Sequence, residues 1–239
     1  MHNDDSIKIK LKSFFLILFE FLFITYTNAQ EIDTVWYSKE WKETIKNNAK
    51  YYRIVKIDTI NNLYDVIDYY KNGNIQSTGN YQSLNPEIEE GIFIYYSRSK
   101  LIKSKSTYKE GVSIKDEWYR RGKLTQVEKS KANSQDTILE FIIYRNNGVI
   151  KVSARMVNNV KDGLFFGNYR NGNMKIKGEA IMGKLKYQVQ FYKNGNKKSE
   201  IIKDNTENNY QYKKYNRKGI LKEEGITIPV TTRRLLLIY

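Results

Sequence analysis

The sequence predicts an all-β protein, an elongated up-and-down meander of about seven stacked β-hairpin repeats in an open single sheet. Three observations support this fold class. Turn motifs recur at a nearly constant period through most of the 239 residues. The segments between the turns are rich in Tyr, Ile, Val and Phe, which suit a pleated, half-buried surface. Beyond the N-terminus, no segment has a long helical period of apolar residues.

The repeat is an aromatic strand end followed by a turn of Lys or Arg, Asn and Gly. Its clearest copies begin at Tyr70, Tyr144, Tyr169 and Tyr192, and weaker copies begin at Tyr96, Tyr119 and Tyr215. The glycines of these turns are Gly73, Gly122, Gly148, Gly172, Gly195 and Gly219. Successive tyrosines are 26, 23, 25, 25, 23 and 23 residues apart, a regularity that indicates a repeat architecture.

The chemistry of the turns predicts hairpins with two strands per repeat. Asn-Gly tolerates positive φ at both central positions of a type I′ turn, whose twist matches the flanking strands. The copies at Tyr96, Tyr119 and Tyr215 depart from this pattern, so we expect longer or looser hairpins there. A second turn is predicted between successive tyrosines, at Glu90-Gly91, Glu110-Gly111, Asp162-Gly163 and Gly183-Lys184.

Residues 1–29 have the features of a secretory signal peptide. Three lysines (Lys8, Lys10 and Lys12) precede an apolar run from Phe14 to Ile24, and Thr27 and Ala29 are placed like the small residues of a cleavage site. The run is shorter than the roughly 20 residues that span a bilayer. We therefore expect export to the periplasm, the outer envelope or the extracellular space.

The rest of the chain divides into three parts. Residues 30–60 are predicted to form an N-terminal cap region, 61–225 the hairpin array, and 226–239 a C-terminal capping strand or tail, because terminal repeats need capping. Within the first part, Ser38 to Lys50 is the best candidate for one short helix, since Trp41 and Ile45 lie four residues apart. The last part ends in Leu235 to Tyr239, which we interpret as a closing strand.

The composition argues against an enzyme. The chain has no Cys, and its single His is His2, inside the predicted signal peptide. No catalytic, cofactor-binding or metal-binding residue is therefore predicted, and no cofactor is expected. Ser97-Arg98-Ser99-Lys100 matches the Ser-x-x-Lys pattern of some serine nucleophiles, but it replaces a hairpin turn where that pattern requires a helix.

Two features could bind a ligand. The repeated tyrosines could stack sugars or bases, but their recurrence with the fold period favours a core role. The formal net charge is +15, and the bases are spread along the whole chain, so we interpret them as a solvated surface that attracts anionic partners nonspecifically. Nucleic acid is an improbable partner for an exported protein.

The Tyr-x-Asn-Gly hairpins, with a secondary turn such as Lys161-Asp162-Gly163, resemble the variant MORN repeats of bacterial proteins known as YwqK-type antitoxins. The resemblance covers about Asn61 to Gly225. The resemblance implies that this protein neutralises a toxin by binding it. Residues 51–96 also look like modules at the N-terminus of exported envelope proteins.

These observations favour a non-enzymatic exported protein that acts as a protein-binding scaffold or adaptor in the cell envelope. The alternatives are an antitoxin-like protein and a basic adaptor that binds anionic membrane surfaces.

Overall fold

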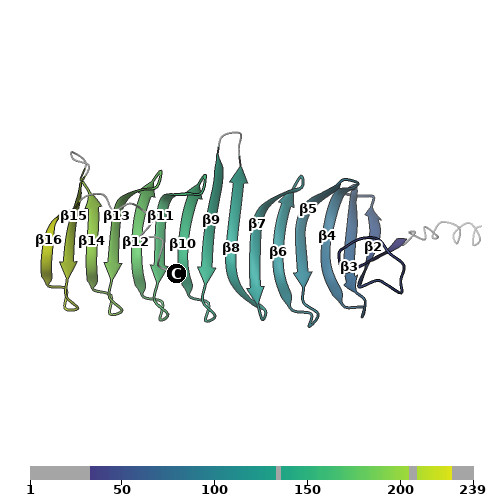
Figure 1. Ribbon diagram of the computed structural model, residues 1–239, viewed down its shortest axis with the longest axis horizontal. Coiled ribbons are helices and arrows are strands. Elements are labelled where there is room, and N and C mark those ends of the chain that lie inside the picture. The colour runs from purple at the N-terminus through teal and green to yellow at the C-terminus, as the bar shows by residue number, and fades with distance from the viewer. Residues whose placement is uncertain (1–32, 133–135, 205–208, 228–239) are drawn as a thin grey trace, which may run out of the picture.

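The computed structural model describes residues 33–132, 136–204 and 209–227, which form one antiparallel sheet (Figure 1). Its strands are β1 (Asp33–Tyr37), β2 (Tyr51–Asp58), β3 (Leu63–Tyr70), β4 (Ile75–Leu84), β5 (Glu87–Tyr96), β6 (Ile102–Lys109), β7 (Val112–Arg120), β8 (Lys123–Ala132), β9 (Thr137–Tyr144), β10 (Ile150–Val157), β11 (Val160–Asn168), β12 (Met174–Ile181), β13 (Lys184–Phe191), β14 (Lys197–Lys203), β15 (Tyr210–Tyr215) and β16 (Leu221–Thr227). Each strand pairs with its sequence neighbours, so the predicted open meander is confirmed. The predicted signal peptide and the closing strand at 235–239 lie outside the described residues.

Seven hairpins correspond to the seven predicted repeats. They are β3–β4, β5–β6, β7–β8, β9–β10, β11–β12, β13–β14 and β15–β16, and each repeat tyrosine lies at or within one residue of the end of the odd-numbered strand. All seven tyrosine turns therefore lie along one long edge of the sheet, at the bottom in Figure 1. We call it the tyrosine-turn edge, and the other the opposite edge. With strands about 4.8 Å apart, the sheet is roughly 70 Å long.

The predicted type I′ geometry is wrong for the Asn-Gly turns. At the first turn only Gly73 has positive φ (84°), the Gly73 amide donates to the Tyr70 carbonyl (2.8 Å), and the Tyr70 amide donates to the Asn74 carbonyl (2.8 Å). This is a three-residue loop in which a type I turn is followed by a left-handed glycine. The same two hydrogen bonds recur around Tyr169 and Tyr192.

The prediction of longer or looser hairpins at the irregular copies is wrong. These turns differ from the others only in detail. At the Tyr119 copy, Arg121 (φ 52°) and Gly122 (φ 74°) form a two-residue loop between the paired Arg120 and Lys123. This is the one tyrosine turn in the described residues with two consecutive positive φ values. In the Tyr96 copy Lys100 (φ 62°) adopts the left-handed conformation that glycine adopts elsewhere.

One of the four predicted second turns is confirmed, and another lies one residue earlier than predicted, at Met182-Gly183 rather than Gly183-Lys184. Glu110-Gly111 and Met182-Gly183 are two-residue turns on the opposite edge with positive φ throughout. Glu90-Gly91 and Asp162-Gly163 instead lie inside β5 and β11, where the pairing register shifts. Glycine at positive φ serves a β-bulge as well as a turn, so the sequence signal was ambiguous. The actual turns there are Asn85-Pro86, with a cis peptide bond, and Asn158-Asn159.

The predicted short helix between Ser38 and Lys50 is wrong, because this segment is a loop that folds back on β1. The Thr44 amide donates to the Trp36 carbonyl (2.8 Å), and the Lys50 amide donates to the Tyr37 carbonyl (2.8 Å). Trp41 has φ 57°, which a right-handed helix forbids. Its ring stacks on Tyr51, with centroids 4.5 Å apart, so tertiary contact determines the conformation.

The sheet has one layer, and two clusters of buried apolar side chains lie on the same face. The first contains Val66, Tyr81 and Phe93, and the second contains Ala154, Phe165 and Ile176. Cross-strand pairs connect Phe93 to Phe165 through Ser106, Asp116, Glu128, Phe141 and Ala154 in turn. We call this side the core face. Its two apolar clusters are therefore separated by a polar stretch.

In both clusters an aromatic ring packs directly over a glycine of a neighbouring strand. A Cβ atom on Gly79 would lie 2.3 Å from the Phe93 ring, and one on Gly178 would lie 2.5 Å from the Phe165 ring and 2.5 Å from the Tyr187 carbonyl oxygen. Side-chain atoms do not approach this closely. Both glycines are therefore required by close packing, whereas the turn glycines are required by backbone conformation.

Gly178→Ala is expected to lower the free energy of unfolding by about 1–3 kcal/mol, because the new methyl group meets both a ring and a backbone oxygen. Chemical denaturation followed by circular dichroism measures the change. The control is Lys177→Ala on the exposed side of the same strand, for which we expect a much smaller effect. Equal stability of Gly178→Ala and the wild type would contradict this packing.

Candidate binding surfaces

The repeat tyrosines connect each turn to the next one. The Tyr70 hydroxyl donates to the carbonyl oxygen of Tyr96 (2.8 Å), the repeat tyrosine of the following hairpin. Tyr192 donates in the same way to Tyr215 (2.8 Å), and Tyr169 donates to Phe191 (2.7 Å). Three of the seven tyrosines thus satisfy a backbone carbonyl one repeat away.

Asparagine amides make a second set of bonds between successive turns. Asn74 donates to the carbonyl of Arg98 (3.1 Å), Asn147 to Arg170 (3.0 Å), and Asn173 to Lys193 (2.7 Å). Asn194 and Asn196 both donate to the carbonyl of Arg217, each at 2.9 Å. The backbone of a basic turn residue is therefore held by the preceding turn.

These contacts change the interpretation of the tyrosines. All seven are half-buried, and none belongs to either buried cluster of the core face. The tyrosines are thus neither the centre of a hydrophobic core nor a free stacking platform: they lie between turns. The turn glycines Gly73, Gly122, Gly148, Gly172, Gly195 and Gly219 are exposed, each with positive φ.

A buried ion network, which the sequence analysis missed, lies on the core face between β2 and β5. The Arg53 guanidinium donates to both carboxylate oxygens of Asp68 (2.8 and 3.2 Å) and to Glu87 (2.5 Å), and the Ser77 hydroxyl donates to Asp68 (2.9 Å). Burial opposes the charge of Arg53, but the hydrogen bonds and negative charge of Asp68 and Glu87 raise its pKa above the ordinary value. Each of these side chains is paired with another member of the network, so we assign the network a structural role.

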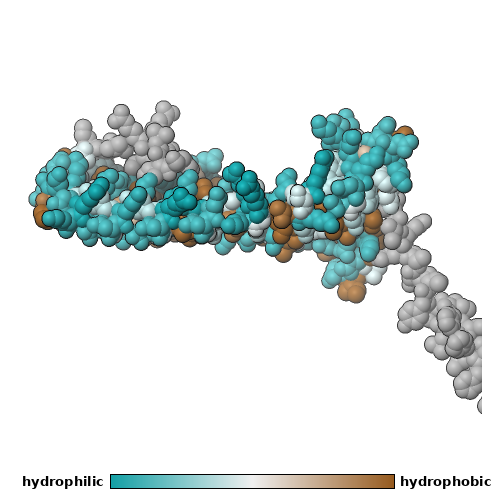
Figure 2. Space-filling view, turned by 90° about the horizontal axis from the view of Figure 1, so that it is seen from below, coloured by the Kyte–Doolittle hydropathy of each residue, from teal (hydrophilic) through white to brown (hydrophobic). Residues whose placement is uncertain are grey.

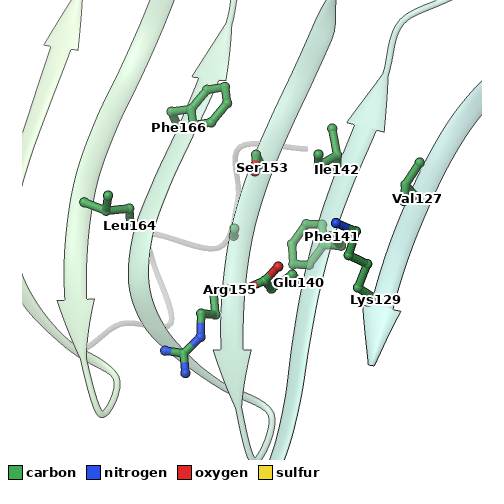
Figure 3. Close-up of a pocket in the computed structure, with 10 residues that line it drawn as sticks. Val127, Lys129, Glu140, Phe141, Ile142, Ser153, Arg155, Leu164 and Phe166 are labelled. Carbon is green, nitrogen blue, oxygen red and sulfur yellow. The ribbon is translucent and has the colours of Figure 1, made fainter. Parts of the chain in front are cut away.

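The opposite side of the sheet, which we call the hollow face, carries a hollow of about 410 Å³ (Figure 3). Apolar Val127, Ile142 and Phe166 lie in one row across β8, β9 and β11. Lys129 and Glu140 lie directly beside each other in the adjacent row. The hollow thus combines an apolar row with a charged cross-strand pair.

The side chains of the hollow do not form a recognisable catalytic arrangement. Its Arg155 side chain is paired with Asp162 (2.8 Å), and its single hydroxyl, Ser153, has Ile142 and Phe166 as cross-strand neighbours. Across 33–132, 136–204 and 209–227, no three His, Cys, Asp or Glu residues form a group that could hold a metal ion. The same residues include no helix long and apolar enough to cross a membrane.

Tyr169→Phe should lower the free energy of unfolding by about 1 kcal/mol, since it removes only the hydroxyl that binds Phe191. Tyr144→Phe is the matched control. It is another repeat tyrosine, and its hydroxyl makes no hydrogen bond within the described residues, so its removal should leave stability nearly unchanged. Urea unfolding of the two variants distinguishes them, and identical midpoints would show that the inter-turn bond does not contribute.

Asp68→Ala should cost about 3–5 kcal/mol, because it leaves the buried Arg53 guanidinium without its main partner. Glu87→Ala removes the partner whose side chain is 48% exposed, and we expect a loss below about 1 kcal/mol. Thermal unfolding of both variants tests this order. A larger loss for Glu87→Ala would refute the assignment of Asp68 as the principal partner.

Comparison with known proteins adds no relative to this description. No protein-family model matches the chain, and no curated protein matches it.

Proposed function

We propose that this chain is a non-enzymatic binding scaffold of the cell envelope, which holds another protein against its elongated sheet. The observation that carries the proposal is the single layer. The described residues form one sheet in a single layer (Figure 1), and an elongated layer of this kind presents a large contact area to a partner. A single layer of strands does not by itself enclose a water-excluded site of the kind that many enzymes use.

The hollow face offers the best contact surface at its N-terminal end. Trp36, Tyr52 and Tyr69 form a row across β1, β2 and β3, with ring centroids 5.1 and 4.8 Å apart, and the two tyrosines are stacked. All three side chains are half-buried. Rigid aromatic side chains that are already packed against one another give a partner contact area at a low cost in conformational entropy.

The envelope location rests on the predicted signal peptide. The resemblance to variant MORN repeats favours a binding role in either compartment. If the chain is exported, its partner is an envelope protein. If it remains in the cytoplasm with an intact N-terminus, neutralisation of a toxin becomes the better proposal.

Cell fractionation with N-terminal sequencing tests the location, and we expect a mature N-terminus near Gln30 in the envelope or outside the cell. Covalent cross-linking in intact cells, followed by affinity capture, then tests the scaffold. We expect one specific partner, lost with Tyr52→Ala combined with Tyr69→Ala.

The matched control combines Ile202→Ser and Ile226→Ser, two exposed apolar side chains at the far end of the same face. Each double variant is first shown to be folded by circular dichroism. The aromatic surface is rejected if capture survives the loss of both tyrosines, or if the isoleucine variant loses the partner equally.

A further inference from the structure

The fold places the excess positive charge of the chain on one edge. The seven tyrosine turns comprise residues 70–76, 96–103, 119–125, 144–151, 169–175, 192–198 and 215–222. Together they contain 17 Lys and Arg residues and no Asp or Glu. The formal net charge of the whole chain is +15, so this edge accounts for all of it.

Other surfaces are balanced. On the opposite edge, the fully described turns at 58–63, 84–87, 109–112, 157–160 and 181–184 contain Asp58, Glu87 and Glu110 against Lys109 and Lys184. On the hollow face, some bases lie between acidic cross-strand partners, as Lys213 does between Glu200 and Glu224, although Lys115 lies beside Lys129. The bases are spread along the whole chain, as the sequence analysis noted, but acidic residues offset them everywhere except in these turns, so the excess positive charge lies on one edge.

The strand pairing places one extra, bulged residue in every one of these hairpins. In each tyrosine hairpin the register skips one residue at the start of the even-numbered strand. In five of the seven hairpins that residue is lysine, namely Lys103, Lys151, Lys175, Lys198 and Lys222. A basic residue thus recurs both at the turn tip and at the bulge behind it.

The spacing of the charges is regular and their backbone is ordered. Successive tyrosine turns are two strands apart, or about 10 Å, and seven turns cover about 60 Å. Asn147, Asn173, Asn194 and Asn196 hold the carbonyls of Arg170, Lys193 and Arg217, whose side chains are exposed. Figure 2, which looks onto the molecule from the side of this edge, shows hydrophilic residues along nearly its whole length.

We propose that the tyrosine-turn edge binds an extended linear polyanion, a polymer whose phosphate or carboxylate groups repeat along one chain. The edge is one turn wide and seven turns long, so a linear polymer can contact every turn, whereas a small anion contacts one. Each additional turn engaged adds to the affinity through effective concentration. Release of counterions from the polymer makes the binding depend on salt. This site is separate from the aromatic surface of the hollow face proposed above to bind a protein.

Inorganic polyphosphate of defined chain lengths is the probe, and fluorescence anisotropy of the labelled polymer measures binding. Affinity should rise with polymer length until the polymer spans about 60 Å and then level off. The logarithm of the affinity should fall linearly with the logarithm of the salt concentration. Equal affinity for tripolyphosphate and for long chains would overturn the proposal, because a single anion site would then explain the binding.

The variant Arg170→Gln/Lys193→Gln/Arg217→Gln removes three charges and keeps the backbone carbonyls that accept the asparagine amides. It should lower the affinity roughly tenfold or more and reduce the magnitude of the salt slope by about 2. The matched control, Lys109→Gln/Lys184→Gln/Lys203→Gln, removes the same charge from the opposite edge and should bind as the wild type does. Equal losses in the two variants would show that only net charge matters.

Vesicles of phosphatidylglycerol provide the last comparison. Binding to the vesicles in preference to long polyphosphate would overturn the proposal in favour of a membrane surface. Should the edge variant fail to fold, the length dependence of the wild type still decides between a linear polymer and the other ligands.

Discussion

Each hairpin of this protein can bury its side chains only against the hairpin beside it, because the sheet has one layer. The contacts that stabilise the structure therefore join hairpins that are consecutive in the sequence. Backbone pairing joins the strands, aromatic rings lie over glycines of the next strand, and tyrosine and asparagine side chains join successive turns. Stability is therefore a sum of similar neighbour terms, as in other repeat proteins.

The constraint also explains why the core face is discontinuous. Between the clusters around Phe93 and Phe165 lies a polar stretch, where the hydroxyls of Ser106 and Ser113 both donate to Asp116. A carboxylate that accepts two hydroxyl protons keeps its hydrogen bonds when it is half-buried. The strands between the two clusters thus depend on polar contacts and strand pairing more than on apolar burial, whereas β3–β5 and β10–β12 depend on packing around an aromatic ring.

The hairpin array was predictable because its signal is redundant: seven tyrosines at a regular spacing survive the loss of any one turn motif. Details of the fold that depend on a single glycine were not predictable. Gly91 and Gly163 read as turns but lie in bulges, since both settings need a residue with positive φ. The Arg53–Asp68 network was missed because the partners are 15 residues apart and meet only through the β2–β3 register.

The short helix predicted around Trp41 failed for a related reason. Two apolar residues four apart are a weak helical signal, and the contact of Trp41 with Tyr51 outweighs it. The packing glycines were also hidden, because nothing local distinguishes Gly178, which lies under a ring, from a glycine that permits a turn.

The charge of the tyrosine-turn edge opposes the folding that creates it. Two unit charges 10 Å apart in water repel by about 0.4 kcal/mol, and physiological salt reduces this further. Many such pairs arise when folding aligns the turns, and no acidic residue within the turns offsets them. Hydrogen bonds between turns, each worth about 1 kcal/mol, are large enough to hold the backbone against this repulsion. The repulsion is then relieved chiefly by ions from outside the chain, and a polymer that supplies many negative charges at once relieves it with the least loss of translational entropy.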